Sequence, residues 1–289
     1  MPLPICHLNG EYLPLEAARV SPLDRAFLFA DAVYEVIPVY AGRPFRLRAH
    51  ADRLVRSLAG IRMPAPLSHE ELAAVCRTLI DRNGGGDQYL YVQVSRGAEF
   101  GRNHAIPEAL PPTLFAFASR LEPLSAQILE RGVSAITAAD TRWARRDIKS
   151  TALLANVLLK QLSVDAGAYE TILLENGQLT EGSSTTVHVV EDGVIRTPPN
   201  GRQMLPGTTR EVVEMLASRL DIGCESGPVS EARLRSADEI WLAFSTRGVL
   251  PVTRLDDAAV GDGRPGALFR RLHGAFHDYV GELAGTPAL

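Results

Sequence analysis

Lysine is nearly absent from this chain of 289 residues. Lys149 and Lys160 are the only two lysines among 30 basic residues, so the other 28 are arginines. On most surfaces either cation is acceptable, but a guanidinium stays charged at any accessible pH and cannot act as a neutral amine. Any chemistry that needs a lysine amine must therefore use one of these two side chains.

Cysteine is also scarce, and long apolar runs are missing. Cys6, Cys76 and Cys224 are odd in number, far apart and in no C-x-x-C pair, which argues against a disulfide scaffold or a zinc ribbon. No apolar run approaches the ~18 residues of a membrane-spanning helix, and the start of the chain lacks the basic and apolar regions of a secretion signal. We expect a cytoplasmic protein that does not enter a membrane.

No excess of positive charge is present either. The 30 basic and 34 acidic residues give a net charge of −4, so nothing indicates a nucleic-acid or membrane-surface partner. His273 and His277 lie four residues apart on a predicted helix but have no third ligand, so no metal site is expected. The chain also has no G-x-G-x-x-G motif after a predicted strand, no P-loop and no G-x-S-x-G motif, which argues against nucleotide sites and the common hydrolases.

Helices and short strands are both predicted in the first part of the chain. Apolar residues spaced by 4, 3 and 4 positions predict an amphipathic helix, and these residues are Leu47, Ala51, Leu54 and Leu58. Ser68 is typical of a helix N-cap, so a second helix is expected over residues 68–81. The expected strands are residues 5–8, 12–13, 32–40, 43–47, 88–95 and 112–119.

The second half alternates short strands with helices. The expected strands are residues 132–139, 170–174, 186–190, 194–197 and 239–244, and the expected helices are 150–165, 209–220 and 266–283. Hairpins and meanders mixed with scattered helices favour a mixed α/β (α+β) fold over a doubly wound parallel sheet. We expect an N-terminal α/β domain over residues 1–121, a connection over 122–131 and a C-terminal α/β domain over 132–289.

Two turns have the composition of an anion site. Gly207 and Thr208 lead into a predicted helix, where backbone N–H groups and nearby hydroxyls bind anions. An ordinary threonine N-cap would give the same pattern. Ser245 and Thr246 follow a predicted buried strand and could add hydroxyls to the same anion.

Arg53, Lys149 and Glu181 are candidates for the chemistry itself. Arg53 could hold a phosphate by a bidentate fork, or lie at the border of its helix with its head in water. Lys149 lies where a strand is expected to give way to a helix, and Glu181 follows 32 residues later. A lysine, a carboxylate and two anion-binding turns suggest a phosphorylated carbonyl cofactor, attached as a Schiff base.

These residues stand in motifs that resemble the class IV aminotransferases of fold type IV, which depend on pyridoxal 5′-phosphate. The resemblance covers nearly the whole chain. The segments that carry it are residues 24–25, 29–36, 50–57, 147–150, 156–161, 167–170, 180–184 and 207–210.

Within that family the chain is most similar to the D-amino-acid aminotransferases. Arg102-Asn103-His104 matches the Arg-x-His pattern that those enzymes use for the substrate α-carboxylate. Three positions depart from the family pattern: Ala30 and Ala32 replace glycines, and Thr186 replaces a usual asparagine. These changes leave the chemistry intact but could reshape the side-chain pocket.

The resemblance implies a role for each candidate residue. Lys149 would carry the cofactor and move the proton of the substrate, and Glu181 would pair with the pyridine nitrogen. The other cofactor-binding residues would be Arg53, Ser183, Ser184, Leu205, Gly207, Thr208, Ser245 and Thr246, most of them in the C-terminal, cofactor-binding domain. The carboxylate trap would be Tyr34, Arg102 and His104. The substrates would be a D-amino acid and a 2-oxo acid, and the enzyme a homodimer with the trap loop contributed across its interface.

Other interpretations of the same motifs stay open. An L-branched-chain aminotransferase, an amine transaminase or a class IV lyase similar to aminodeoxychorismate lyase would share the fold. A catalytically silent binding protein on that fold is disfavoured, because the lysine and its carboxylate partner are both present.

Overall fold

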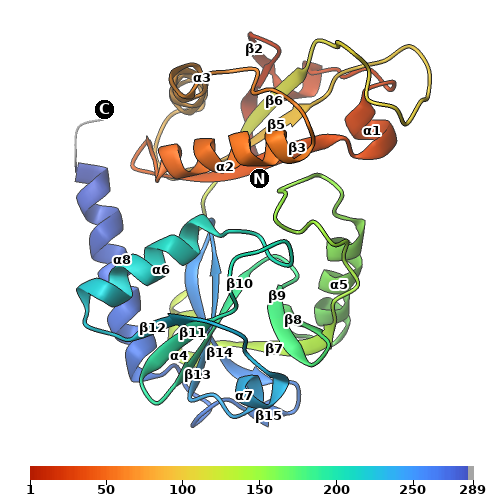
Figure 1. Cartoon of the computed structure of the whole chain (residues 1–289). Helices are drawn as coiled ribbons and strands as arrows, with labels where there is room; N and C mark the ends of the chain where they lie inside the picture. Colours follow the sequence, from red (N-terminus) through yellow and green to blue (C-terminus); the bar gives the residue numbers. More distant parts are fainter. Residues whose placement is uncertain (286–289) are drawn as a thin grey trace. The chain divides into compact units, whose positions relative to one another are not determined.

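The computed structural model describes residues 1–285 and divides the chain into two compact units (Figure 1). The first unit holds Met1–Glu122 and Ile148–Leu153, together with residues 282–285. The second unit holds Pro123–Asp147 and Leu154–Gly281. The short segment with Lys149 therefore groups with the first unit, although it lies between two stretches of the second.

The first unit is built on a six-stranded antiparallel sheet. Asn9 and Gly10 have φ angles of 49° and 95°, as a type I′ hairpin between β1 and β2 requires. Ala41 and Gly42, with φ of 49° and 78°, make the corresponding turn between β3 and β4. The strand order is β2-β1-β6-β5-β3-β4, with β1 (Pro2–Leu8), β2 (Glu11–Pro14), β3 (Ala32–Tyr40), β4 (Arg43–Pro44), β5 (Gln88–Ser95) and β6 (Thr113–Arg120).

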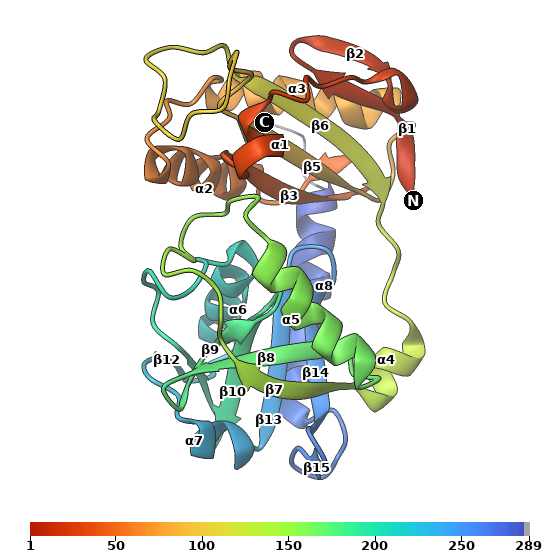
Figure 2. The same ribbon diagram turned by 90° about the vertical axis from the view of Figure 1, so that its right-hand side faces the viewer.

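Two helices cover one face of this sheet, α2 (Leu47–Gly60) and α3 (His69–Arg82) (Figure 2). Every second residue of the strands points toward them, so the core is made of Val33, Ile37, Val39, Leu90, Val92, Val94, Leu114, Ala116 and Ala118 with the apolar sides of both helices. Ser68 and Glu71 form a capping box at the start of α3, which confirms the predicted N-cap. The unit also contains the 3₁₀ helix η1 (Leu15–Ala17) and the short helix α1 (Arg25–Phe29).

The opposite face of the sheet carries a row of aromatic rings. Tyr34 stacks on Tyr91 with 5.4 Å between ring centres, and Tyr91 lies 5.2 Å from Phe117. Phe115 continues the row at 5.7 Å from Phe117. Residue parity along β3 therefore separates Tyr34, on the aromatic face, from Glu35, on the face that the helices cover.

The second unit contains a nine-stranded mixed sheet. The strand order is β12-β11-β10-β13-β14-β7-β8-β9, with β15 paired to β14. Its neighbours are antiparallel except for the pairs β14–β7, β7–β8 and β11–β12. The strands are β7 (Val133–Ala139), β8 (Glu170–Glu175), β9 (Gln178–Gly182), β10 (Thr186–Glu191), β11 (Val194–Thr197), β12 (Cys224–Ser226), β13 (Glu239–Phe244), β14 (Gly248–Leu255) and β15 (Ala258–Ala259).

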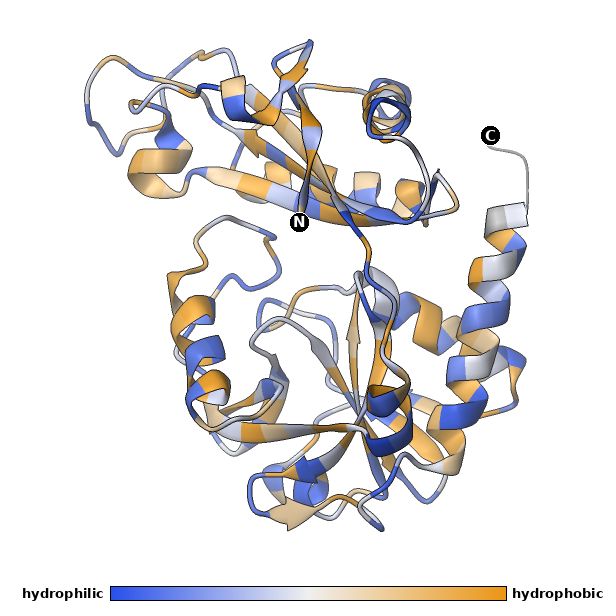
Figure 3. Ribbon diagram, turned by 180° about the vertical axis from the view of Figure 1, so that it is seen from behind, coloured by the Kyte–Doolittle hydropathy of each residue, from blue (hydrophilic) through white to orange (hydrophobic). Residues whose placement is uncertain are grey.

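Five helices accompany this sheet: α4 (Ala126–Arg131), α5 (Leu154–Asp165), α6 (Thr208–Arg219), α7 (Glu231–Arg235) and α8 (Ala267–Gly285). Polar and apolar residues alternate along α8 (Figure 3). At its start, the Glu239 carboxylate accepts hydrogen bonds from the N–H groups of Leu268 and Phe269. Phe269 packs on Trp241, which is fully buried. No helix among residues 1–285 is both long and apolar enough to cross a bilayer.

The mixed α/β fold predicted from the sequence is confirmed, but two element boundaries are wrong and several short elements were missed. The helix expected from residue 150 begins at Leu154, because Ser150 and Thr151 instead form backbone contacts with β3. The strand expected over residues 43–47 ends at Pro44, since Arg46 takes a left-handed conformation and becomes the N-cap of α2. The missed strands are β9, β12, β14 and β15, and the missed helices are α1, α4 and α7.

Candidate active site

Lys149 lies on an extended segment along the edge of β3. Its carbonyl oxygen accepts a hydrogen bond from Tyr34 N at 2.9 Å, and its own N–H donates to Ser57 Oγ at 3.1 Å. The Nζ atom lies 4.5 Å from the centre of the Tyr34 ring, within the range of a cation–π contact. The backbone and the ring together fix the amine on the aromatic face of the sheet.

The other lysine has a different environment. Lys160 lies on α5, and its ammonium donates to the carbonyl oxygen of Tyr169. It also lies 5.1 Å from the centre of the Tyr169 ring. Both contacts join α5 to the start of β8, so Lys160 has a structural role.

On the helix-covered face, β3 contributes a buried carboxylate. Glu35 accepts hydrogen bonds from Arg53 Nε and Nη2 and from His50 Nδ1, each at 2.7 Å. All three side chains are at most 3% exposed. Burial alone would raise the pKa of Glu35, but Arg53 and His50 lower it to about 2.

This pairing corrects one expectation for Arg53. The alternative with its head in water is wrong, because the guanidinium is buried against Glu35. Burial also lowers the pKa of His50, against the opposing effect of Glu35. The expected phosphate contact of Arg53 stays a prediction, now with a carboxylate that orients its Nε and Nη2 atoms.

The loop between β5 and β6 carries Arg102 and His104, both exposed. The Arg102 guanidinium lies 5.1 Å from the centre of the Phe29 ring, and the His104 ring lies 5.1 Å from it. These two predicted carboxylate ligands are therefore neighbours on one aromatic ring, which comes from α1. Tyr34, their expected partner, contacts Tyr91 and Lys149.

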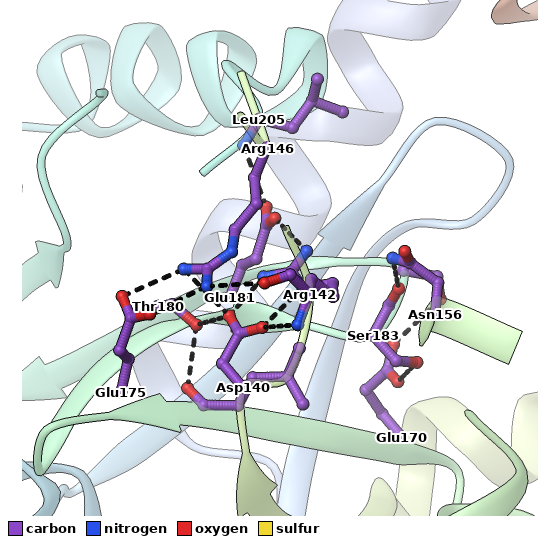
Figure 4. A network of polar contacts seen from close by, with 12 residues as sticks. Asp140, Arg142, Arg146, Asn156, Glu170, Glu175, Thr180, Glu181, Ser183 and Leu205 are labelled. Carbon is purple, nitrogen blue, oxygen red and sulfur yellow. Dashed lines mark hydrogen bonds and ion pairs between the residues drawn. The ribbon is translucent and has the colours of Figure 1, made fainter. Parts of the chain in front are cut away.

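In the second unit, Glu181 lies at the centre of a network of charges (Figure 4). Arg142 donates to Glu181 Oε1 at 2.5 Å, and the backbone N–H of Leu205 donates to Oε2 at 3.2 Å. Arg142 is held in turn by Asp140, with donor–acceptor distances of 3.0 and 2.7 Å. Burial raises the pKa of Glu181, while Arg142 acts to lower it.

The rest of the network fixes Asp140. Thr180 donates its hydroxyl hydrogen to Asp140 at 2.7 Å, and Arg146 lies 3.3 Å from the same carboxylate. Arg146 is also paired with Glu175 at 2.9 Å. Five charged groups thus alternate in sign, so the buried carboxylates of Asp140 and Glu181 are each paired with an arginine.

Ser183 and Ser184 have a protein partner in this structure. Their hydroxyls donate to the carboxylate of Glu170, which is fully buried. Asn156 on α5 donates to the carbonyl oxygen of Ser183 at 2.7 Å. These bonds fix the turn that follows Glu181, and the expected cofactor contacts of the two serines stay predictions.

The start of α6 has the features expected of a phosphate site. Gly207 is its N-cap and provides no side-chain hydrogen bond to the first turn. A Cβ on Gly207 would lie 2.8 Å from Thr186 Oγ1, so only glycine brings the backbone this close to that hydroxyl. Unsatisfied N–H groups beside hydroxyls fit the phosphate of a cofactor.

Sheet register brings two further hydroxyls toward this helix end. Thr186 on β10 pairs with Ala243 on β13, so Ser245 and Thr246 follow two and three residues beyond that pair. Thr208 is itself buried. The second unit therefore gathers Leu205, Gly207, Thr208, Ser245 and Thr246 in one region with Glu181, as a single phosphorylated ring would need.

Sequence reasoning missed Glu35, Arg142 and Asp140. A signal for Glu35 is present, because a charged residue alternates with Val33 and Ile37 on a strand face that is otherwise apolar. Arg142 and Asp140 follow β7 directly but have no distinctive motif. Within residues 1–285, no group of three His, Cys, Asp or Glu side chains is arranged to hold a metal ion.

Comparison with known proteins gives a consistent result. The family model described as amino-transferase class IV matches residues 32–255. The D-alanine aminotransferase of Bacillus licheniformis is 38% identical over 273 residues, which cover 94% of this chain and 95% of that protein. The enzyme of the same name from Staphylococcus epidermidis is 36% identical over 274 residues, covering 94% and 96%.

Solved structures of branched-chain aminotransferases are also similar. The branched-chain enzyme from Escherichia coli has a TM-score of 0.88 and 27% identity, covering 95% of this chain and 93% of that one. A second branched-chain amino acid aminotransferase, solved with pyridoxamine 5′-phosphate, has a TM-score of 0.90 and 27% identity, covering 99% and 96%. These matches confirm the fold type IV architecture that the sequence predicted.

Proposed function

Because the chain belongs to the class IV aminotransferases, we propose that it moves an amino group between a D-amino acid and a 2-oxo acid in a ping-pong reaction. The cofactor of this family is pyridoxal 5′-phosphate, as the sequence predicted. When bound, it supplies an aldehyde that takes up the amino group and a ring that spreads the charge of the substrate α-carbon.

The observation that carries the proposal is the position of Lys149. Of the two lysines, Lys160 is bound to Tyr169, whereas Lys149 presents its amine over Tyr34. A lysine amine in that position can attach the cofactor and then carry a proton to and from the substrate α-carbon, as a general base and acid. Tyr34 restricts where the Nζ atom moves.

Glu181 would hold the pyridine nitrogen in its protonated form. Its Oε1 atom is bound by Arg142 and its Oε2 atom by Leu205 N, so the carboxylate has a fixed orientation. A protonated ring nitrogen held there would add a second cation beside the carboxylate and would oppose the effect of burial, which raises the pKa of Glu181. The start of α6 would then receive the phosphate, whose negative charge is opposite to the partial charge of the helix N-terminus.

Two features support a D-amino acid as substrate. The curated relatives of 36–38% identity are D-alanine aminotransferases, whereas the branched-chain structures are 27% identical. Arg102 and His104 lie together on Phe29, where a guanidinium and an imidazole can bind one carboxylate. The strong structural likeness to branched-chain enzymes makes an L-selective branched-chain aminotransferase the second candidate.

We further infer a cytoplasmic homodimer. The exposed side of α5 carries Leu154, Val157 and Leu158, which are 72%, 61% and 60% exposed. Their spacing places them on one side of the helix, and a contiguous apolar surface of this kind supports association with a second copy. In such a dimer, the loop with Arg102 and His104 would serve the partner's site.

Substrates offered as separate D and L enantiomers test the proposal. D-alanine and D-glutamate with 2-oxoglutarate or pyruvate as acceptors should give turnover, and L-leucine should give much less. Equal rates with D-alanine and L-leucine would contradict the D-amino-acid assignment and favour the branched-chain one. Sedimentation or light scattering of the purified protein tests the homodimer.

A further inference from the structure

The loop that carries Arg102 and His104 is fixed by a platform of buried polar groups. Asp24, 1% exposed, accepts hydrogen bonds from Ser95 Oγ at 2.9 Å and from Thr113 Oγ1 at 2.6 Å. Ser95 ends β5 and Thr113 begins β6, so one carboxylate oxygen joins both ends of the loop. The other oxygen of Asp24 caps α1 through Ala26 N at 2.8 Å.

Arg25 extends this platform to the middle of the loop. Arg25 is 3% exposed, and its guanidinium donates through Nη1 to Glu99 Oε2 at 2.8 Å and to the carbonyl oxygen of Asn103 at 2.7 Å. Its Nε donates to Asp31 at 2.9 Å, and this bond orients the guanidinium. Asn103 stands between Arg102 and His104, so the bond from Arg25 lies at the backbone of the predicted carboxylate trap.

Phe29, four residues after Arg25, holds the two side chains themselves. Arg25 lies 4.9 Å from the centre of its ring, and Arg102 and His104 lie 5.1 Å from it. The negative face of an aromatic ring attracts a guanidinium. This attraction favours one arrangement of the long, exposed Arg102 side chain over the others that it could adopt.

We propose that Arg25 and Phe29 are positioning residues that set the placement of Arg102 and His104, and so determine how well the enzyme selects a substrate α-carboxylate. This inference rests on the proposed function, because it needs Arg102 to bind that carboxylate. Arg25 and Phe29 act through the loop and not through direct contact with the substrate. A displacement of about 1 Å at a binding group can lower a rate on the order of 10²-fold.

The experiment compares Arg25→Met, Phe29→Leu and Arg102→Ala with the parent enzyme. We expect Arg102→Ala to lower kcat/KM for D-alanine by roughly 10- to 150-fold, as loss of a charge-assisted contact does. Arg25→Met should lower it roughly 10- to 100-fold, mainly through KM, with an unchanged cofactor spectrum. In the double variant that combines Arg25→Met with Arg102→Ala, the two losses of kcat/KM should not add, because Arg25 acts through Arg102.

Trypsin supplies a measurement that is independent of activity. Arg102 is exposed, so cleavage after it reports how firmly the loop is held. Cleavage at this position should be faster in Arg25→Met and in Glu99→Gln, a milder variant that retains the fold if Arg25→Met does not. Arg48→Met, on the exposed side of α2, is the matched control and should leave both cleavage and KM unchanged.

The possible results distinguish a failure of the proposed carboxylate site from a failure of the positioning role alone. If Arg102→Ala has no effect on D-alanine, the proposed carboxylate site itself fails. If Arg102→Ala has its effect but neither Arg25→Met nor Glu99→Gln changes KM or cleavage, the positioning role is wrong and the proposed function stands. Fully additive losses in the double variant would also overturn the positioning role.

Discussion

The amine of Lys149 lies 4.5 Å from the centre of the Tyr34 ring. This relationship distinguishes it from Lys160, whose ammonium is bound to Tyr169. We expect the purified protein to be yellow and to lose its visible band on treatment with borohydride. Peptide mapping after reduction should find the pyridoxyl group on Lys149.

The two lysines are natural controls for each other. Lys149→Arg should lose both the visible band and the activity, because a guanidinium does not give up its proton. Lys160→Arg keeps the charge on α5 and should retain both. A pyridoxyl group on Lys160 would overturn the assignment of Lys149.

Glu181→Gln should retain the cofactor and lose most of the activity. The glutamine side chain keeps the shape of the glutamate but cannot supply the negative charge that holds the ring nitrogen protonated. Loss of one preorganised electrostatic partner costs on the order of 10²–10³ in kcat. Rates of single half-reactions with D-alanine measure this loss, and a variant within a few-fold of the parent would show that Glu181 is only structural.

Substitution by glycine at Ala30 and at Ala32 should change the free energy of unfolding in opposite directions. Ala30 has φ and ψ of 53° and 31°, a left-handed conformation that strains an alanine. Ala30→Gly should therefore raise the free energy of unfolding by up to about 1 kcal/mol. Ala32 begins β3, is fully buried and lies outside the positive-φ region, so Ala32→Gly should lower it by roughly 0.5–1 kcal/mol. Urea denaturation measures both changes, and a stabilising Ala32→Gly would contradict this account.

Acid should destabilise the protein through His188. This imidazole is fully buried, and burial followed by the charge of Arg210 lowers its pKa to about 3. Its neutral form is favoured in the folded state, so the stabilisation is complete above the unfolded pKa of 6.5 and is lost as the pH falls toward 3. In this range the free energy of unfolding should fall by up to about 1.4 kcal/mol per pH unit from this one group. Urea denaturation at pH 6, 5 and 4 gives the free energy of unfolding at each pH. Its decrease with falling pH should be smaller for His188→Gln than for the parent, and equal decreases would refute the assignment.

Much of the fold was predictable from local patterns. The strand from Ala32 to Tyr40 and the helix capped by Ser68 have clear periodicity or caps. β14 has neither, because it is buried along most of its length and contains Pro251, which usually argues against a central strand. The proline is tolerated because register pairing with β7 begins only at Val252. The start of α5 was mispredicted because tertiary pairing with β3 overrides the helix tendency of residues 150–153.

The candidate site was predictable in its residue types but not in its supporting contacts. Lys149 stands out because the chain has only two lysines, and Glu181 because it lies in a segment that resembles the family. Arg142 could not be assigned, because its contact with Glu181 depends on β7 and β9 lying on either side of β8. The pairing of Arg53 with Glu35 likewise joins a helix to a strand 18 residues away, which periodicity alone does not specify.

The placement of Lys149 within the first unit has a consequence for how the protein is made. The six strands of that unit are complete once Arg120 has left the ribosome, yet the edge of β3 lacks its partner until Ser150 has been added. Synthesis must pass through Pro123–Asp147, which belongs to the other unit, before this partner exists. A nascent chain therefore exposes an unpaired strand edge for that interval, when binding by a chaperone would protect it from aggregation.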